Sequence, residues 1–172
     1  ARIAEADGAD RLELCMALAE GGLSPSAGLL RAVRAAVGIP VHVLIRPRPG
    51  DSVYSAEEVS VMCADVREAR RAGIDGLVVG CLTREGVVDR PAMELLRAAA
   101  GSLPLVAHRA VDAAWDLAET VEAMAGLGIR RVLTSGGAGM AEQGIPALTS
   151  LVAHWGERLT ILAGGSIRAE NV

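Results

Sequence analysis

This chain of 172 residues has very few aromatic side chains, which make up 2% of it, and it contains no phenylalanine. It also has no block of basic residues, and its formal net charge at pH 7 is −4. Nucleic-acid-binding surfaces need clustered lysine and arginine to neutralise phosphates, and aromatic rings on which bases stack. The composition therefore argues against nucleic acid as a partner.

Long apolar runs and regularly spaced cysteines are missing as well. No apolar stretch approaches the roughly 18–20 residues that a membrane-spanning helix needs, and no signal-peptide pattern is visible, so we expect no membrane association. Cys15, Cys63 and Cys81 are odd in number and widely spaced, which predicts reduced thiols in a cytoplasmic protein. Spacings such as C-x-x-C and H-E-x-x-H do not occur, so a zinc site has little support.

What the chain does contain is a regular alternation of glycine, short apolar run and amphipathic segment, repeated about every 30 residues. The apolar runs are residues 11–15, 41–45, 77–80, 105–109, 132–135 and 159–163. This rhythm is typical of successive βα units in a parallel sheet. With 51% hydrophobic residues the chain can bury a core, and we predict one α/β domain over residues 1–172.

Helix boundaries follow from capping residues. Ser24 with Pro25 is expected to start one helix, and Ser55 with Glu58 forms a capping box for the next. Asp89 is expected to cap a third. The face of the second helix that should be buried consists of Val59, Met62, Cys63, Val66 and Ala69. The glycines expected to end helices in the left-handed conformation are Gly38, Gly73, Gly101, Gly128 and Gly156.

Two architectures are built from such repeats: the open doubly wound sheet and the closed (β/α)8 TIM barrel. The phosphate-binding sequences G-x-G-x-x-G and G-x-x-x-x-G-K-[ST] of nucleotide-binding sheets are absent. Polar residues alternate within the expected strands, as Glu13 and Cys15 do, and a barrel interior accepts them better than a central strand of an open sheet. We therefore predict a (β/α)8 TIM barrel, present here as an incomplete barrel of about strands 2–7 that lacks the first strand and the last βα portion.

A series of short runs is similar to the signature sequences of one protein family. They include residues 8–15 (GADRLELC), 19–26 (AEGGLSPS), 41–48 (VHVLIRPR), 80–83, 108–110, 133–136 (LTSG), 164–165 and 170–172. In this order they resemble the CutC family, whose members are usually described as copper homeostasis proteins. The family usually has a third glycine where Ser166 stands. The resemblance covers essentially the whole chain and implies a (β/α)8 barrel with a role in copper homeostasis.

Chemically active residues gather where the predicted strands end, and barrel sites lie at the carboxyl ends of strands. The expected catalytic residues are Glu13 and His108, which would move a proton, and Asp112, which would orient a histidine or arginine. The expected ligand-binding residues are Arg46, Arg48, Arg109, Ser135, Gly164 and Gly165, the last three from two glycine-rich turns. The alternative is an internal ion-pair network, Glu13 with Arg46 and Asp112 with Arg109, that only satisfies charge.

Copper would need a different set of ligands, because Cu(I) prefers two or three thiolate or thioether sulfurs close together. Cys15 has a suitable place on its strand and is the expected metal ligand. Cys81 ends a strand two places further round, about 10 Å away at the backbone. Cys63 lies on the core face of a helix, and Met16 should point towards the helices. We therefore expect Cu(I) binding to depend on Cys15.

Three interpretations of function stay open, of which the third is a non-enzymatic barrel that acts mainly through self-association of its exterior helices. The resemblance implies a cytoplasmic protein of copper binding and copper homeostasis, with Cu(I) as its ion. The residues themselves suit a TIM-barrel enzyme that acts on a small phosphorylated or polar metabolite by acid/base chemistry. The expected partners are a small ligand or copper ion and, through the exterior helices, further copies in a homo-oligomer.

Overall fold

The computed structural model describes residues 1–171, and helices and strands alternate along it. It divides into two compact units, which are described separately. Unit 1 comprises Ala1–Val79 with Glu94–Leu105, and unit 2 comprises Gly80–Met93 with the chain from Val106 onward. That residues 1–172 form one domain stays a prediction, and Val172, the last residue of the family-like runs, lies outside the described residues.

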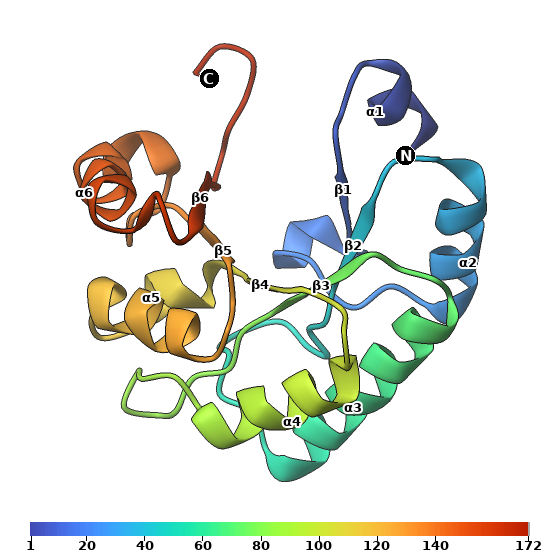
Figure 1. Ribbon diagram of the computed structural model, residues 1–172, viewed down its shortest axis with the longest axis horizontal. Helices are drawn as coiled ribbons and strands as arrows, with labels where there is room; N and C mark the ends of the chain where they lie inside the picture. The colour runs from blue at the N-terminus through green and yellow to red at the C-terminus, as the bar shows by residue number, and fades with distance from the viewer. Residues whose placement is uncertain (172) are drawn as a thin grey trace. The chain divides into compact units, whose positions relative to one another are not determined.

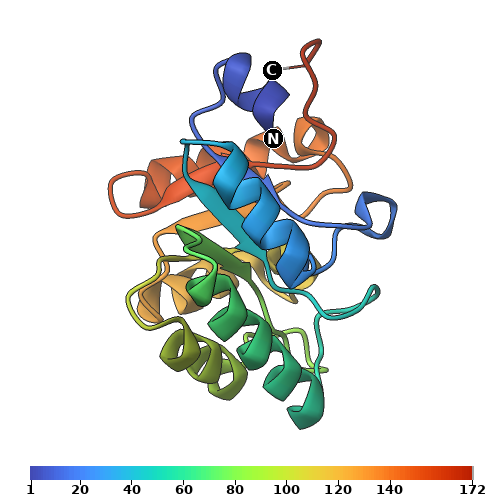
Figure 2. The ribbon, with the colours of Figure 1, turned by 90° about the vertical axis from the view of Figure 1, so that its right-hand side faces the viewer.

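Unit 1 begins with helix α1 (Arg2–Ala6) and then contains three parallel strands. They are β1 (Leu12–Leu14), β2 (Val41–Leu44) and β3 (Gly76–Val79). Between them lie a short 3-10 helix, η1 (Leu18–Glu20), and the helices α2 (Ala27–Ala36) and α3 (Ala56–Arg71), which run alongside β2 in Figure 2. The register places Glu13 beside His42, and His42 beside Gly76.

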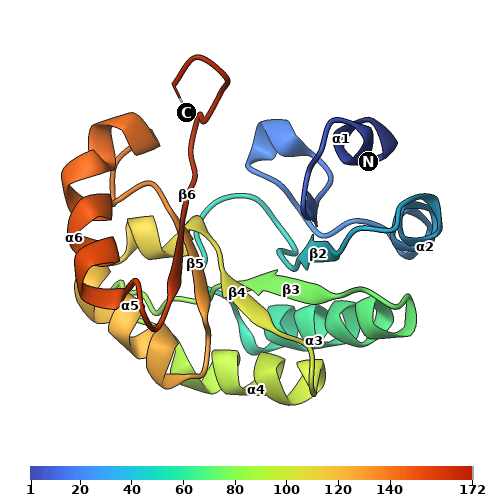
Figure 3. The same cartoon turned by 45° about the horizontal axis from the view of Figure 1, so that its top comes forward.

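Unit 2 repeats the pattern. Two elements belong partly to each unit. Helix α4 (Arg90–Ala100) has its first residues in unit 2, and strand β4 (Leu105–Ala107) has its last two residues there. The following elements are η2 (Arg109–Ala113), α5 (Leu117–Gly126), β5 (Arg131–Thr134), η3 (Ala141–Gly144), α6 (Ile145–Trp155) and β6 (Thr160–Ala163). Strand β5 is parallel to β4 on one side and to β6 on the other, and α5 and α6 cover one side of β5 and β6 (Figure 3).

Every described strand pair is parallel and joins strands that follow each other in the sequence, with a helix between them (Figure 1). This confirms the α/β prediction, and the strands lie within one or two residues of the predicted runs. The parallel βα repeat is the arrangement of an incomplete TIM barrel. Within residues 1–171, no helix has both the length and the apolar character needed to cross a bilayer.

Helix α3 shows how local sequence forms an element. Its capping box is present: the Ser55 hydroxyl accepts the Glu58 N–H, and the Glu58 carboxylate accepts the Ser55 N–H at 2.8 Å. All five residues predicted for its core face are buried. Because burial of apolar surface stabilises a helix more than propensity does, this face anchors α3 against the strands of unit 1.

The predicted start of α2 was wrong by two residues. Ser26, not Ser24, is its N-cap and accepts the Leu29 N–H at 3.2 Å. The Ser24 hydroxyl instead accepts the Arg46 N–H at 2.9 Å, where the chain leaves β2. Ser24 therefore joins the segment before α2 to the end of β2, and the helix begins after Ser26.

The glycines that were predicted to end helices in the left-handed conformation do so at some positions and not at others. Gly73, Gly101 and Gly128 take the predicted left-handed conformation, but Gly38 and Gly156 do not. Helix α2 ends instead through Val37 in an extended conformation, and the Gly38 N–H donates to the Glu5 carboxylate at 2.7 Å. A partner from another segment thus replaces the left-handed turn.

Candidate functional site

In unit 2, Asp112 lies in η2 just after β4, and its side chain is 8% exposed. One carboxylate oxygen, Oδ1, accepts the Ser135 N–H at 3.1 Å, the Gly137 N–H at 3.0 Å and the Thr134 hydroxyl at 2.5 Å. The other, Oδ2, accepts the Ser135 N–H and the Ser135 hydroxyl, each at 2.9 Å, and Arg109 Nε–H at 2.9 Å. The end of β5 is therefore arranged around this carboxylate.

These donors set the charge of Asp112. Burial alone would raise the pKa of this carboxyl group, but the hydrogen bonds from Thr134, Ser135, Gly137 and Arg109 together outweigh it and lower the pKa. Asp112 is therefore an ionised group at neutral pH. It contacts an arginine, one of the two groups that it was predicted to orient, and a catalytic role for it stays a prediction.

The glycine-rich turn after β5 is occupied by the protein's own carboxylate. The Ser135 and Gly137 N–H groups point at Asp112, and the Gly136 N–H donates to the Thr134 hydroxyl at 2.9 Å. Successive N–H groups in such a turn form an anion-binding concavity. Here Asp112 fills it, so the N–H of Ser135, predicted to bind a ligand, is already used.

Arg109 is the second member of this cluster. Its Nε donates to Asp112, and its Nη2 donates to the Ser135 hydroxyl at 3.0 Å and to the carbonyl oxygens of Ala138 and Gly139 at 3.3 and 3.4 Å. The Asp112–Arg109 ion pair, which the sequence left open as an alternative, is therefore formed. The arginine side chain nevertheless remains 41% exposed.

His108 is buried at the end of β4 and caps η2. Its Nδ1 accepts the Ala110 N–H at 3.0 Å, which places the proton of the neutral ring on Nε2. The ring lies against Gly80, where an added Cβ would be 2.7 Å from His108 Cε1. In this tautomer His108 offers a donor at Nε2, whereas a general base would need a lone pair there.

Glu13 lies on β1 in unit 1 and is an exposed residue, although surrounding protein partly desolvates its carboxyl group. This partial burial raises the pKa of its carboxyl group, and attraction to Arg11 opposes the rise. The ion pair with Arg46, which the sequence left open as an alternative, is not formed among residues 1–171. Glu13 and His108 belong to different units, so their action at one mouth stays a prediction.

Arg46 instead holds loops of unit 1 together. Its Nη1 donates to the carbonyl oxygens of Glu20 and Gly22, each at 2.8 Å, and its Nη2 donates to that of Gly50 at 2.9 Å. These acceptors belong to the loops after β1 and β2. Such a clamp explains the arginine without a ligand, because backbone carbonyls take the N–H groups predicted to bind an anion.

Arg48 is tied in the same way. Its Nε donates to Glu58 at 2.5 Å, its Nη1 to Asp51 at 3.0 Å and its Nη2 to the Val53 carbonyl at 2.7 Å. The guanidinium also lies 5.3 Å from the centre of the Tyr54 ring. Arg48 therefore connects the loop after β2 to the start of α3.

The thiols are in three different environments. Cys63 is buried on the core face of α3, as predicted, and Cys81 is buried as well, while Cys15 is half-buried after β1. Burial, and to a smaller extent the nearby Glu13, raises the pKa of Cys15. Among residues 1–171 there is no group of three or more His, Cys, Asp or Glu side chains placed to hold a metal ion.

The prediction for Met16 was wrong. Strand β1 already ends at Leu14, and Met16 pairs with Leu23 in an isolated antiparallel bridge. Its side chain is 46% exposed and does not pack under the helices. Side chains alternate between the two faces of a sheet only within a strand, so this alternation does not apply to Met16, which lies beyond the end of β1.

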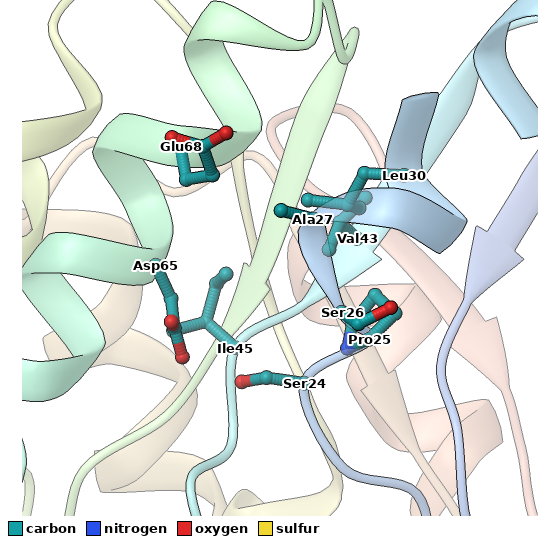
Figure 4. Close-up of a pocket in the computed structure, with 9 residues that line it drawn as sticks. All are labelled: Ser24, Pro25, Ser26, Ala27, Leu30, Val43, Ile45, Asp65 and Glu68. Atoms are coloured by element: carbon teal, nitrogen blue, oxygen red, sulfur yellow. The ribbon is translucent and has the colours of Figure 1, made fainter. Parts of the chain in front are cut away.

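A cavity that the sequence did not reveal lies in unit 1 beside β2. It measures about 120 Å³ and is lined by Ser24, Pro25, Ser26, Ala27, Leu30, Val43, Ile45, Asp65 and Glu68 (Figure 4). Burial raises the pKa of Asp65, and a hydrogen bond with the Ser24 hydroxyl opposes the rise. Glu68 is paired with Arg31 and Arg71. The sequence gives one signal for this cavity: the carboxyl group of Asp65 lies among the apolar residues of α3.

Comparisons with known proteins match this chain along its whole length. A family model described as the CutC family matches residues 1–172. A family protein CutC from Klebsiella pneumoniae (strain 342) is 46% identical over 172 residues, which are 100% of this chain and 69% of that protein. A family protein CutC from Xylella fastidiosa (strain Temecula1 / ATCC 700964) is 47% identical over 169 residues, or 98% of this chain and 63% of that protein.

Solved structures agree with the fold. The crystal structure of CutC from Streptococcus agalactiae, provisionally described as a copper homeostasis protein, has a TM-score of 0.90 at 36% identity, covering 94% of this chain and 80% of that one. The phosphoenolpyruvate phosphomutase from Streptomyces platensis subsp. rosaceus has a TM-score of 0.62 at 18% identity, covering 95% of this chain and 71% of that one. The second likeness shows the fold alone.

Proposed function

Because this chain belongs to the CutC family, we propose that it takes part in copper homeostasis by binding Cu(I) through the Cys15 thiolate. The observation that supports Cys15 as the Cu(I) ligand is the exposure of its side chain. Cys15 is half-buried, whereas the other two thiols in the described part of the chain are 7% and 0% exposed. The related structure from Streptococcus agalactiae is described in terms of copper homeostasis. We also propose a cytoplasmic location, where thiols stay reduced.

The surroundings of Cys15 support access to the thiol. An added Cβ at Gly22 would lie 3.3 Å from Cys15 Sγ and 2.8 Å from Leu44 Cδ2. Because residue 22 is glycine, the space beside the Cys15 sulfur stays open; the side chain of any other residue would fill it. Cu(I) favours two or three sulfur ligands, and among the described residues no three or more His, Cys, Asp or Glu side chains gather where they could hold a metal ion. A single thiolate implies modest affinity, or a second sulfur donated by another molecule.

The raised pKa of Cys15 adds a pH dependence. The thiol is protonated at neutral pH, so Cu(I) must displace a proton when it binds. Affinity should therefore rise with pH until the thiol is fully ionised.

The test is a Cu(I) titration against a competing chelator under reducing conditions. Stoichiometric binding that is lost in Cys15→Ser and kept in Cys81→Ala supports the proposal. Cys81→Ala is the matched control, because it removes a thiol that is 0% exposed. Equal affinity of the wild type and Cys15→Ser would overturn it.

A second candidate function is acid/base catalysis on a small phosphorylated or polar metabolite. The observation that favours it is Glu13, whose pKa is raised by burial and which forms no ion pair among residues 1–171. A carboxyl group of this kind can exchange a proton closer to neutral pH. Glu13→Gln should abolish turnover of any such metabolite without lowering Cu(I) affinity. Full turnover by this variant would exclude Glu13 as the proton-transfer group.

A further inference from the structure

We infer that unit 2 contains a binding site for a small oxyanion, the phosphoryl or carboxylate group of a metabolite, at Arg109 Nη1 and the turn of residues 164–166 after β6. This inference goes beyond Cu(I) binding and does not depend on it. It rests on three observations: a fixed arginine with a free edge, a turn with unused N–H groups beside it, and the filling of the other glycine-rich turn.

Arg109 is fixed by hydrogen bonds on one side only. Its Nε and Nη2 donate to Asp112, to the Ser135 hydroxyl and to two carbonyl oxygens, whereas Nη1 donates to no acceptor among residues 1–171. Ser135 is fully buried and Asp112 nearly so, which keeps the guanidinium in one orientation. An arginine held in this way loses little conformational entropy when an anion binds to its remaining edge.

The turn after β6 lies against that edge. An added Cβ at Gly165 would be 3.2 Å from Arg109 Cζ and 3.3 Å from Nη1, so only glycine lets the backbone of this turn approach the guanidinium so closely. Gly165 and Ser166 both have positive φ values, +105° and +59°. Their N–H groups have no acceptor in the described part of the chain. Free N–H groups of consecutive residues in such conformations, next to a guanidinium, are suited to an anion.

The turn after β5 shows how the N–H groups of a glycine-rich turn bind a carboxylate. There the N–H groups of Ser135 and Gly137 bind the Asp112 carboxylate. No carboxylate of the described chain occupies the second turn. The Gly165 carbonyl accepts the Ala141 N–H at 3.1 Å, which ties this turn to the start of η3. Each turn contains a Gly-Gly pair, and within residues 1–171 the N–H groups of Gly165 and Ser166 have no acceptor, whereas those of Ser135 and Gly137 bind Asp112.

The experiment is a calorimetric titration of the full chain with inorganic phosphate and, separately, with acetate. We expect saturable binding of phosphate at millimolar concentrations, and Arg109→Gln should weaken it by about tenfold or more, since a hydrogen bond to a charged group is lost. Arg130→Gln is the matched control, because it removes the same charge from an exposed position in unit 2 that forms no described ion pair. Stronger binding of acetate than of phosphate would assign the site to carboxylates.

A variant with higher affinity for phosphate shows that weaker binding by Arg109→Gln is not caused by misfolding. In Asp112→Asn the arginine loses its counter-charge while the amide oxygen still accepts N–H groups, so phosphate should bind several-fold more tightly.

Two results would overturn the inference: no binding of either anion by the wild type, or equal binding by the wild type and Arg109→Gln. Cu(I) titration of Arg109→Gln separates this inference from the copper proposal. That affinity should be unaffected whichever way the phosphate titration turns out.

Discussion

Asp112 and Ser135 are joined by three hydrogen bonds: the Ser135 N–H approaches Asp112 Oδ1 at 3.1 Å and Oδ2 at 2.9 Å, and the Ser135 hydroxyl donates to Oδ2 at 2.9 Å. They connect the segment after β4 to the end of β5, between residues 23 positions apart. Both side chains are almost completely buried, so neither has water as an alternative partner. This pair therefore stabilises the two strand ends.

Removal of the Asp112 carboxylate should destabilise the protein strongly. We expect Asp112→Ala to lower the free energy of unfolding by about 3 kcal/mol, because it leaves buried donors and the Arg109 charge without their partner. Asp112→Asn should cost less, about 1–2 kcal/mol, since the amide oxygen still accepts hydrogen bonds. Urea denaturation measures both. Glu157→Gln, at an exposed position without a described ion pair, is the control and should change little.

The same carboxylate predicts a loss of stability in acid. Its pKa is lowered in the folded protein, so the stability it contributes is present above the unfolded-state pKa, about 3.8, and is lost as the pH falls through the folded-state value. The difference in unfolding free energy between the wild type and Asp112→Asn should therefore shrink below about pH 4. A difference that stays constant between pH 7 and pH 3 would contradict this assignment.

Glu13 should behave in the opposite way. Burial raises its pKa in the folded state, so the ionised form disfavours folding, and protonation relieves this as the pH falls through the folded-state pKa. Glu13→Gln should therefore be more stable than the wild type at pH 7 and equal to it at low pH. Because the side chain is partly exposed, the gain will be small. Thermal unfolding at several pH values measures it, and a loss of stability at pH 7 would show that Glu13 has a stabilising partner.

Ser166 is a non-glycine residue in the left-handed region, with φ +59°. A serine there is strained, so Ser166→Gly should stabilise the protein by about 1 kcal/mol. Ser150→Gly is the matched control, because Ser150 is exposed inside helix α6 and the same replacement should destabilise by about 1 kcal/mol. If both variants lose stability in urea denaturation, residue 166 is not strained.

Gly76 is packed under His42. An added Cβ would lie 2.6 Å from His42 Nε2, and both residues belong to unit 1. Gly76→Ala should therefore destabilise by about 1–3 kcal/mol through overpacking. Gly126→Ala is the control, since nothing lies within 4 Å of an added Cβ there. In the double variant with His42→Ala, the penalty of Gly76→Ala should largely disappear. An undiminished penalty would place its cause in the backbone.

The fold was predictable because its signals are local. The capping box at Ser55, the core face of α3 and the strand runs each depend on residues within one element. The Asp112–Arg109 pair could also be foreseen, since the two residues are three positions apart in one short helix. Ser24 and Arg46 were assigned incompletely for the opposite reason. Each is engaged by a partner from another segment, which the spacing within its own segment does not reveal.

The sequence by itself therefore determined the parallel βα repeat, the likeness to the CutC family and most of the helix boundaries, because these follow from periodicity, capping and ordered short runs. Only the tertiary structure decided how the polar residues at the strand ends are used. It tied Arg46 and Arg48 to loops, placed Asp112 in the turn after β5 and left Arg109 Nη1 without an acceptor among residues 1–171. Such hydrogen bonds join residues far apart in the chain, and their partners are settled only when the strands and loops have packed.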